Sequence, residues 1–469
     1  MKEILRGMMN QIRLRRRFAL DYGINPIIYV LVERAERELE SKLLTALFLV
    51  KKGFHVVIGQ QWILTLNKNC LPTGTFFFKG TNKIHTNNMA KVRQFEHVVV
   101  AMEEEQLDEC ISPPDFYFNY LFDIIYSKDT RHHCQLLLAK HESEAKTIKQ
   151  VMPELTVRLT GSPRTDFLRQ ELVTAYYSVR DEISRRVSSK FVLINTNTGY
   201  INSNLTANQL LELYKNASPG LSSTGDEWIE RHKEQMDIRS KWEKYNLRSI
   251  CKLVELFGRC SPNQKIIIRP HPSENLDIYV RLSNKYPNVE VASNQESARP
   301  WILASDILIH TGCTTGAEAV AMNHPAISIQ EKGSEDIRFR ASNNVSYLTH
   351  TAEEAFQSVQ DFYAGKLELG NPSRLKELWP AQEGKFAAER IADEIYDFYL
   401  GFGGLSGDFE LTLSGKFKQV KLTDFYKQKM FVELPQIEHI LAQIYQRLPA
   451  MPQVRLYEIS RNVFYMRPS

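Results

Sequence analysis

A histidine lies between two prolines directly after an apolar run in the segment KIIIRPHPSEN, residues 265–275. The run of three isoleucines is typical of a buried β-strand. Pro270 and Pro272 restrict the backbone on both sides of His271, so the imidazole loses little entropy when it binds a ligand. Beside Arg269, a histidine held in this way can donate hydrogen bonds to a phosphate. For this segment alone, a histidine that caps a turn at a strand end is the plainer interpretation.

A second segment whose residues could take part in ligand binding is DILIHTGCTTGAEA, residues 306–319. It joins an apolar strand to a helix through a turn of small residues that includes Gly312. Thr314 and Thr315 stand where the helix begins, so they can cap it and offer hydroxyls beside unpaired amides that attract anions. Glu318, one turn further, is suited to hold ribose hydroxyls. We predict a phosphate and nucleotide site here, although an ordinary capped helix also explains the segment taken alone.

Three adjacent glutamates at positions 103–105 follow another apolar run. Adjacent carboxylates repel one another, so at least one is expected to have a raised pKa and to act as a general base. The alternative is a solvated acidic helix start, which the helix dipole favours.

The elements that must position these residues alternate from residue 25 to about 400: short apolar runs are separated by amphipathic segments. This alternation indicates parallel sheets covered by helices on both faces, with ligand sites at the carboxyl ends of the strands. We predict an α/β protein of two Rossmann-like, doubly wound domains that face each other across a cleft, with a small C-terminal appendage. Arg34, Arg37 and Glu38 are weaker candidates for contact with the acceptor. For them, a salt-bridged face of a helix exposed to solvent is the plainer interpretation.

The predicted domain boundaries follow from breaks in this alternation. A basic arm spans residues 1–24, an acceptor domain residues 25–165, and a nucleotide domain residues 166–377. A crossover helix spans residues 378–400, and a linker with the appendage spans residues 401–469.

Composition narrows the class of protein. Hydrophobic residues make up 43% of the 469 residues and charged residues 24%, which excludes a disordered or fibrous chain. The net charge of +4 with interspersed signs gives no reason to expect nucleic acid as a partner. Six cysteines without a CxxC pair favour reduced thiols in a cytoplasm over disulfides or structural zinc.

The arginine-rich arm of residues 1–24 allows two interpretations. Its apolar residues alternate with basic ones, so it could lie on an anionic membrane surface or pack on its own protein. No apolar window is long enough to span a membrane, and no secretory signal is expected. We predict a cytoplasmic protein, in peripheral contact with the inner membrane if the arm binds lipid.

Together, the segments RPHPSEN, HTGCTTGAEA and EEEQL resemble those of bacterial surface-carbohydrate biosynthesis proteins with the GT-B glycosyltransferase fold. These proteins are related in pattern to sialyltransferases, polysialyltransferases and capsule Kdo transferases that carry an HP motif. The segments GSPRTD and INTNTGYIN add to the resemblance, which covers roughly residues 25–400.

This resemblance implies roles for single residues. His271 would bind the phosphate and assist the departing nucleotide, Thr314 and Thr315 would bind the phosphate, and Glu104 or Glu105 would deprotonate the acceptor hydroxyl. The family's glycine after the two acids is replaced by glutamine, so the identity of the base stays open.

The implied activity is transfer of a sugar, in the first place a CMP-activated acidic sugar such as Kdo or a nonulosonic acid, to a surface polysaccharide or a lipid-linked glycan precursor. The chain contains no DxD pair, so we expect no metal and no cofactor beyond the nucleotide-sugar co-substrate. Arg269, His271 and helix amides would replace the metal. Three alternatives stay open: a CDP-glycerol- or UDP-sugar-dependent transferase, a UDP-sugar 2-epimerase on the same fold, and a non-catalytic glycan-binding protein.

Overall fold

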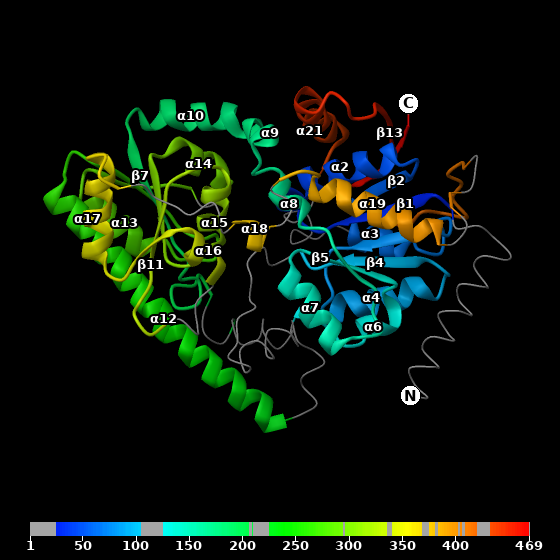
Figure 1. Ribbon diagram of the computed structural model, residues 1–469, viewed down its shortest axis with the longest axis horizontal. Helices are drawn as coiled ribbons and strands as arrows, with labels where there is room; N and C mark the ends of the chain where they lie inside the picture. Colours follow the sequence, from blue (N-terminus) through cyan, green and yellow to red (C-terminus); the bar gives the residue numbers. More distant parts are fainter. Residues whose placement is uncertain are drawn as a thin grey trace. The chain divides into compact units, whose positions relative to one another are not determined.

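The chain divides into two compact units in the computed structural model (Figure 1). Unit 1 comprises residues 1–107, 122–167 and 379–469, and unit 2 comprises residues 108–121 and 168–378. The structure describes residues 25–104, 125–205, 209, 225–293, 296–334, 340–367, 375–379, 383–401, 404–405, 409–419 and 432–468. The predicted basic arm and Glu105 lie outside these residues.

Unit 1 contains one sheet in the order β13-β14-β2-β1-β3-β4-β5-β6. The strands β1–β6 are parallel, and all of them except the edge strand β6 are almost wholly buried. These strands are β1 Ile27–Val32, β2 His55–Gln60, β3 Thr75–Phe78, β4 Val98–Met102, β5 Leu136–Ala139 and β6 Val157–Leu159. Long apolar runs such as IIYVLV form them because a parallel sheet buries both of its faces.

The end of the chain is part of this sheet rather than a separate appendage. The strands β13 (Val454–Ser460) and β14 (Val463–Pro468) form an antiparallel hairpin, and β14 pairs antiparallel with β2. The alternation of strands and helices does not predict such an added hairpin. The hairpin therefore gives residues 454–468 a structural role that the sequence left undefined.

The helices of unit 1 include α2, which packs against α8, α19 and α21. The predicted crossover segment contains α19, whose first amides, of Ala387 and Ala388, donate to the carboxylate of Asp166 at 2.8 and 2.9 Å. These bonds satisfy orphan donors at the helix start. The helices are α2 Ala35–Lys51, α3 Gln61–Leu66, α4 Lys83–Arg93, α6 Thr130–His133, α7 Glu142–Val151, α8 Pro163–Asp166, α19 Ala387–Leu400 and α21 Leu434–Arg447.

Unit 2 contains a fully parallel sheet in the order β12-β11-β10-β7-β8-β9. The chain starts at β7 in the middle, moves to one side through β8 and β9, and then returns to the other side of β7 with β10. This is the Rossmann order, and its switch point lies between β7 and β10. The strands are β7 Phe191–Asn195, β8 Lys265–Arg269, β9 Val289–Val291, β10 Ile307–His310, β11 Ala326–Ile329 and β12 Tyr347–Thr349.

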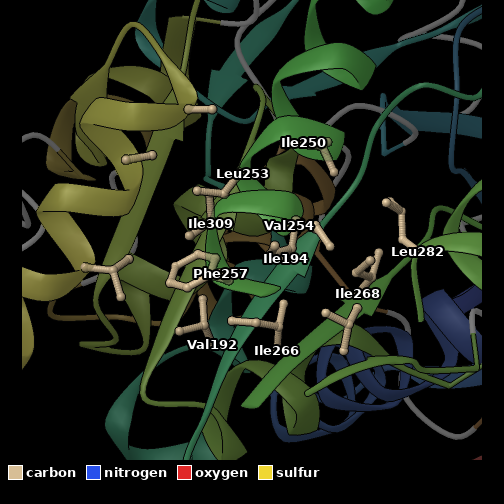
Figure 2. Packing of buried hydrophobic residues seen from close by; sticks show 14 of the residues in the cluster. Val192, Ile194, Ile250, Leu253, Val254, Phe257, Ile266, Ile268, Leu282 and Ile309 are labelled. Atoms are coloured by element: carbon tan, nitrogen blue, oxygen red, sulfur yellow. The ribbon is translucent and has the colours of Figure 1, made fainter. Parts of the chain in front are cut away.

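One face of the unit 2 sheet is covered by the long helix α12, which packs Leu253, Val254 and Phe257 onto the strands (Figure 2). Ile194 and Ile309 point to the same core. The remaining helical elements of unit 2 are α9 Gln170–Val173, η1 Thr174–Tyr176, α10 Tyr177–Val187, α12 Gly225–Cys260, α13 Asp277–Lys285, α14 Ala298–Ala304, α15 Thr314–Ala321, α16 Arg340–Val345, α17 Ala352–Tyr363 and α18 Leu375–Leu378.

Both units confirm the predicted α/β class with doubly wound parallel sheets. Among the described residues, no helix has the length and apolar character required to cross a bilayer.

Candidate functional site

Three polar residues end three neighbouring strands of unit 2. Asn195 of β7 is the register partner of Arg269 of β8, and His310 ends β10 on the other side of β7. The residue before each of them, an isoleucine, belongs to the core under α12. Because side chains alternate along a strand, the three polar side chains lie on the opposite face of the sheet. They therefore gather at the carboxyl edge, around the switch point.

His310 shapes the turn that follows β10. It is fully buried, and burial lowers its pKa to about 3, so the ring is neutral. Its Nδ1 accepts hydrogen bonds from the amides of Gly312 (3.0 Å) and Cys313 (3.3 Å), and Nε2 therefore donates to Ser346 Oγ at 2.9 Å. Gly312 has a φ of +89°, which favours glycine. Gly312 thus sets the form of the turn, and its amide is occupied by His310 instead of facing a ligand.

The start of α15 carries unused hydrogen-bonding groups. The helix begins at Thr314 with Cys313 as its cap residue, and no side chain caps it, so the predicted threonine cap is wrong. The amides of Thr314 and Thr315 have no acceptor within the described part of the chain. Thr315 Oγ1 is buried and lacks a partner there too. A helix start of this kind binds anions through its amides and its dipole.

Arg269 is a buried cation next to this helix start. It is 8% exposed, and its Nη2 donates to the backbone oxygen of Glu296, whereas no carboxylate of the described residues forms an ion pair with it. Burial lowers the pKa of the guanidinium, while Cys313, Glu318 and Glu296 lie near enough to oppose that shift. A buried charge is costly unless it is paired, which makes this position suited to an anion.

These groups form what we call the anion site: the side chains of Asn195, Arg269 and Thr315 with the amides of Thr314 and Thr315. Both polar atoms of Asn195 are buried without a partner in the described structure. The site combines donors from β7, β8 and α15, and it contains a positive charge that forms no ion pair with a carboxylate of the described residues. That combination can bind a phosphate or a similar oxyanion.

His271 lies beyond the end of β8 and is exposed. Its Nδ1 lies 2.8 Å from Ser273 Oγ and accepts from the amide of Ser273 at 3.3 Å. The ring proton of the neutral imidazole is then on Nε2. Ser273 therefore contacts the ring of His271 on its Nδ1 side.

Glu318 is held by an ion pair inside unit 2. Its Oε2 lies 3.3 Å from Arg299 Nε, and Arg299 donates in turn to the hydroxyl of Tyr176 at 2.6 Å. Both charged side chains are largely buried. The predicted ribose-binding carboxylate is thus oriented by a cation from α14.

In unit 1, Glu104 is buried and pairs with Lys42, which has no exposed surface. Burial raises the pKa of Glu104, and Lys42 opposes that shift. Its second oxygen, Oε2, has no partner in the described structure. Glu103 is buried as well, so the alternative of a solvated acidic helix start is wrong for these two residues.

The three weaker candidates in and beside α2 separate into two environments. Glu38 is buried and accepts from Lys79 Nζ at 2.9 Å and from the amide of Glu33 at 2.8 Å. Its charge also raises the pKa of Glu104. Arg34 and Arg37 lie on the exposed side at the helix start. The structure therefore brings Glu38 together with Glu104 and leaves the two arginines apart from them.

Asn195 and Glu274 of unit 2 were not among the candidate site residues identified from the sequence. Both lie in segments that carry the resemblance, INTNTGYIN and RPHPSEN. The available signal was a polar residue at the end of an apolar strand for Asn195, and a glutamate shortly after such a strand for Glu274. Which strands are neighbours, and hence which of these residues meet, follows from the sheet order alone.

No family model and no curated protein matches the chain. Solved structures do resemble it. A protein from Listeria monocytogenes described as a UDP-N-acetylglucosamine 2-epimerase matches with a TM-score of 0.50 and 9% identity over 80% of this chain and 97% of its own. The UDP-GlcNAc 2-epimerase from Neisseria meningitidis bound to UDP-GlcNAc matches with a TM-score of 0.45 and 11% identity, over 80% and 99% of the two chains.

A variant of the wall teichoic acid polymerase TagF matches with a TM-score of 0.43 and 12% identity, over 85% of this chain and 98% of its own. Among these likenesses, the match to the Listeria protein is the one on which the fold rests. The chain described here therefore has the predicted GT-B fold with two Rossmann-like domains.

Proposed function

We propose that this protein is a metal-independent glycosyltransferase that moves a sugar from a nucleotide donor to a glycan acceptor. The observation that carries the proposal is the buried guanidinium of Arg269, which forms no ion pair with a carboxylate of the described residues and lies beside the unpaired amides at the start of α15. The phosphate of a nucleotide would supply the missing negative charge. A hydrogen bond that involves a charged group contributes about 1.5–3 kcal/mol, so a few of them account for micromolar binding.

The chemistry of transfer assigns roles to the other residues. Loss of the nucleotide leaves negative charge on its phosphate, which His271 would stabilise through Nε2 together with the anion site. The acceptor hydroxyl needs a base, which we assign to Glu104 or Glu105. For Glu104, Lys42 holds one carboxylate oxygen and favours the ionised form that a base requires.

The donor we propose first is a CMP-activated acidic sugar, and the acceptor is a surface polysaccharide or its lipid-linked precursor. The motif resemblance supports this choice. CDP-glycerol- or UDP-sugar-dependent transfer would use the same phosphate contacts and differs in the nucleotide. We also propose that the protein acts in the cytoplasm and that residues 1–24 contact the inner membrane, which sedimentation with anionic vesicles would test.

A thermal-shift screen with CMP, CDP, UDP and GDP tests the nucleotide proposal. CMP should raise the melting temperature of the wild type and of Arg281→Met, a control at an exposed arginine of α13, and should raise that of Arg269→Met much less. If UDP stabilises the protein and CMP does not, the proposed donor changes from a CMP-activated to a UDP-activated sugar. Stabilisation by glycans but by no nucleotide would indicate a binding protein and reject the enzyme.

The reaction itself separates the remaining alternatives. A transferase consumes the donor only with an acceptor, whereas an epimerase converts a UDP-sugar alone. Turnover should survive thorough treatment with EDTA because protein groups bind the phosphate. Loss of turnover that manganese or magnesium restores would overturn the metal-independent mechanism.

A further inference from the structure

Two loops at the carboxyl edge of unit 2 run side by side, and we call them the paired loops: residues 196–205 after β7 and residues 270–276 after β8. The amide of Asn275 donates to the backbone oxygen of Asn202 at 2.7 Å. The amide of Asn204 donates to the backbone oxygen of Ser273 at 3.2 Å. The loop that contains His271 is therefore fixed against the loop from the central strand.

Glu274 connects the paired loops from within. Its side chain has no exposed surface, and it accepts hydrogen bonds from the amide of Thr198 (2.7 Å), from Thr196 Oγ1 (2.7 Å) and from the hydroxyl of Tyr279 (2.5 Å). No cation of the described residues forms an ion pair with it. A buried carboxylate is tolerated only when donors compensate it, so these three bonds must form together.

The hydroxyl of Thr196 transmits this arrangement to the histidine. Thr196 has one hydroxyl proton, and it donates that proton to Glu274. The same oxygen accepts from the amide of His271 at 3.3 Å. The carboxylate thereby sets the direction of the Thr196 lone pairs and, through them, the position of the His271 backbone.

The paired loops approach each other closely at a glycine. A Cβ atom at Gly199 would lie 2.2 Å from Ser273 Oγ, and this hydroxyl contacts Nδ1 of His271. Glycine at this position thus leaves room for the serine that orients the imidazole. Both the backbone and the ring of His271 depend on contacts between the two loops.

We propose that Glu274 is a positioning residue: acting through Thr196 and the paired loops, it holds His271 toward the phosphate of a bound nucleotide. This inference rests on the proposed function, since it requires a nucleotide ligand. Glu274 would not touch the ligand itself. Its removal should therefore affect contacts to the phosphate and leave contacts to the nucleoside unchanged.

Titration calorimetry with CMP and with cytidine tests this inference on Glu274→Ala and Glu274→Gln. We expect Glu274→Ala to weaken CMP binding about tenfold, the loss of one charge-assisted contact, with cytidine binding unchanged. Glu274→Gln should have a smaller effect, because its amide oxygen still accepts from two donors while its nitrogen cannot accept from the third. If the thermal-shift screen selects UDP, then UDP and uridine are the probes.

A double-mutant cycle with His271→Ala separates positioning from general destabilisation. If Glu274 acts through His271, Glu274→Ala should cause no further loss of CMP affinity in the His271→Ala background. Additive losses would overturn the inference, as would unchanged CMP affinity in Glu274→Ala when His271→Ala is impaired. Absence of CMP and UDP binding to the wild type would instead reject the proposed function.

Glu144 of unit 1 offers a matched control. It is also a buried glutamate that accepts from a backbone amide, of Lys140 at 2.5 Å, and from a tyrosine hydroxyl, of Tyr126. It differs from Glu274 in its ion pair with Lys140 Nζ at 3.2 Å. Glu144→Ala should lower stability without changing the ratio of CMP to cytidine affinity. If Glu274→Ala fails to fold, Thr196→Val removes only the connecting hydroxyl, and it should reproduce the selective loss of CMP affinity; unchanged affinity would overturn the inference.

Discussion

Replacing Arg269 with methionine should separate ligand binding from stability. The variant loses one hydrogen bond to the backbone oxygen of Glu296, which contributes about 1.5–3 kcal/mol because the donor is charged. It also relieves the burial of an unpaired guanidinium, which costs several kcal/mol. Because the two terms have opposite signs and similar size, the free energy of unfolding of the ligand-free protein should fall by no more than about 1 kcal/mol, or rise.

The ligand-bound protein should respond differently. Loss of the Arg269 contact should weaken nucleotide binding about 10- to 100-fold. A nucleotide at 100 times its dissociation constant stabilises the wild type by about 2.7 kcal/mol, and the same concentration would stabilise a variant with 100-fold weaker binding by about 0.4 kcal/mol. Differential scanning fluorimetry with and without nucleotide measures both effects.

One result would contradict the ligand-binding role of Arg269. A large loss of stability in the ligand-free variant, about 3 kcal/mol or more, together with an unchanged nucleotide-induced shift would show that the guanidinium serves the fold. The Arg281→Met control should match the wild type in both measurements.

Three further predictions concern groups whose burial the structure defines. His310→Asn keeps an acceptor for the turn amides and removes a histidine that is neutral when folded; between pH 6.5 and about 3 the wild type should lose about 1.4 kcal/mol per pH unit more than the variant, and parallel pH profiles would contradict this. Gly316→Ala places a Cβ 2.1 Å from His310 Nε2 and should cost about 1–3 kcal/mol in urea unfolding, so an unchanged midpoint would show that α15 can shift. Lys42→Met leaves Glu104 buried without its cation and should cost about 3–5 kcal/mol, most of which Glu104→Gln should restore; a double variant as unstable as the single one would contradict the pairing argument.

The fold was largely predictable because the periodicity of hydrophobic residues and the turn residues between elements are local properties of the sequence. Runs such as IIYVLV and KIIIR became buried parallel strands, as their continuous apolar character indicates. The hairpin of residues 454–468 was not predictable in this way. Its pairing with β2 joins segments about 400 residues apart, and the choice of partner depends on which sheet edge is available after the other strands have paired.

The candidate site was predictable in its residue types but not in its connections. Arg269 and Thr315 were identified from strand-end and helix-start patterns. Arg269 is buried and forms no ion pair with a carboxylate of the described residues, and this environment depends on other elements, which no local pattern specifies. Glu104 illustrates the same limit, since its partner Lys42 comes from a helix 62 residues earlier in the chain.

The two histidines at strand ends show what decides between a structural and a ligand-binding role. His310 belongs to the strand itself and points to the face opposite α12, where burial keeps it neutral and the following turn uses its Nδ1. His271 comes two residues after the end of β8, beyond the sheet edge, where it is exposed. A histidine inside the strand has its direction fixed by the alternation of side chains, whereas one beyond the edge needs separate contacts to acquire a direction. For His271, Thr196 accepts from the backbone amide and Ser273 contacts Nδ1 of the ring, and these contacts are the ones through which Glu274 would act in the positioning role that we propose.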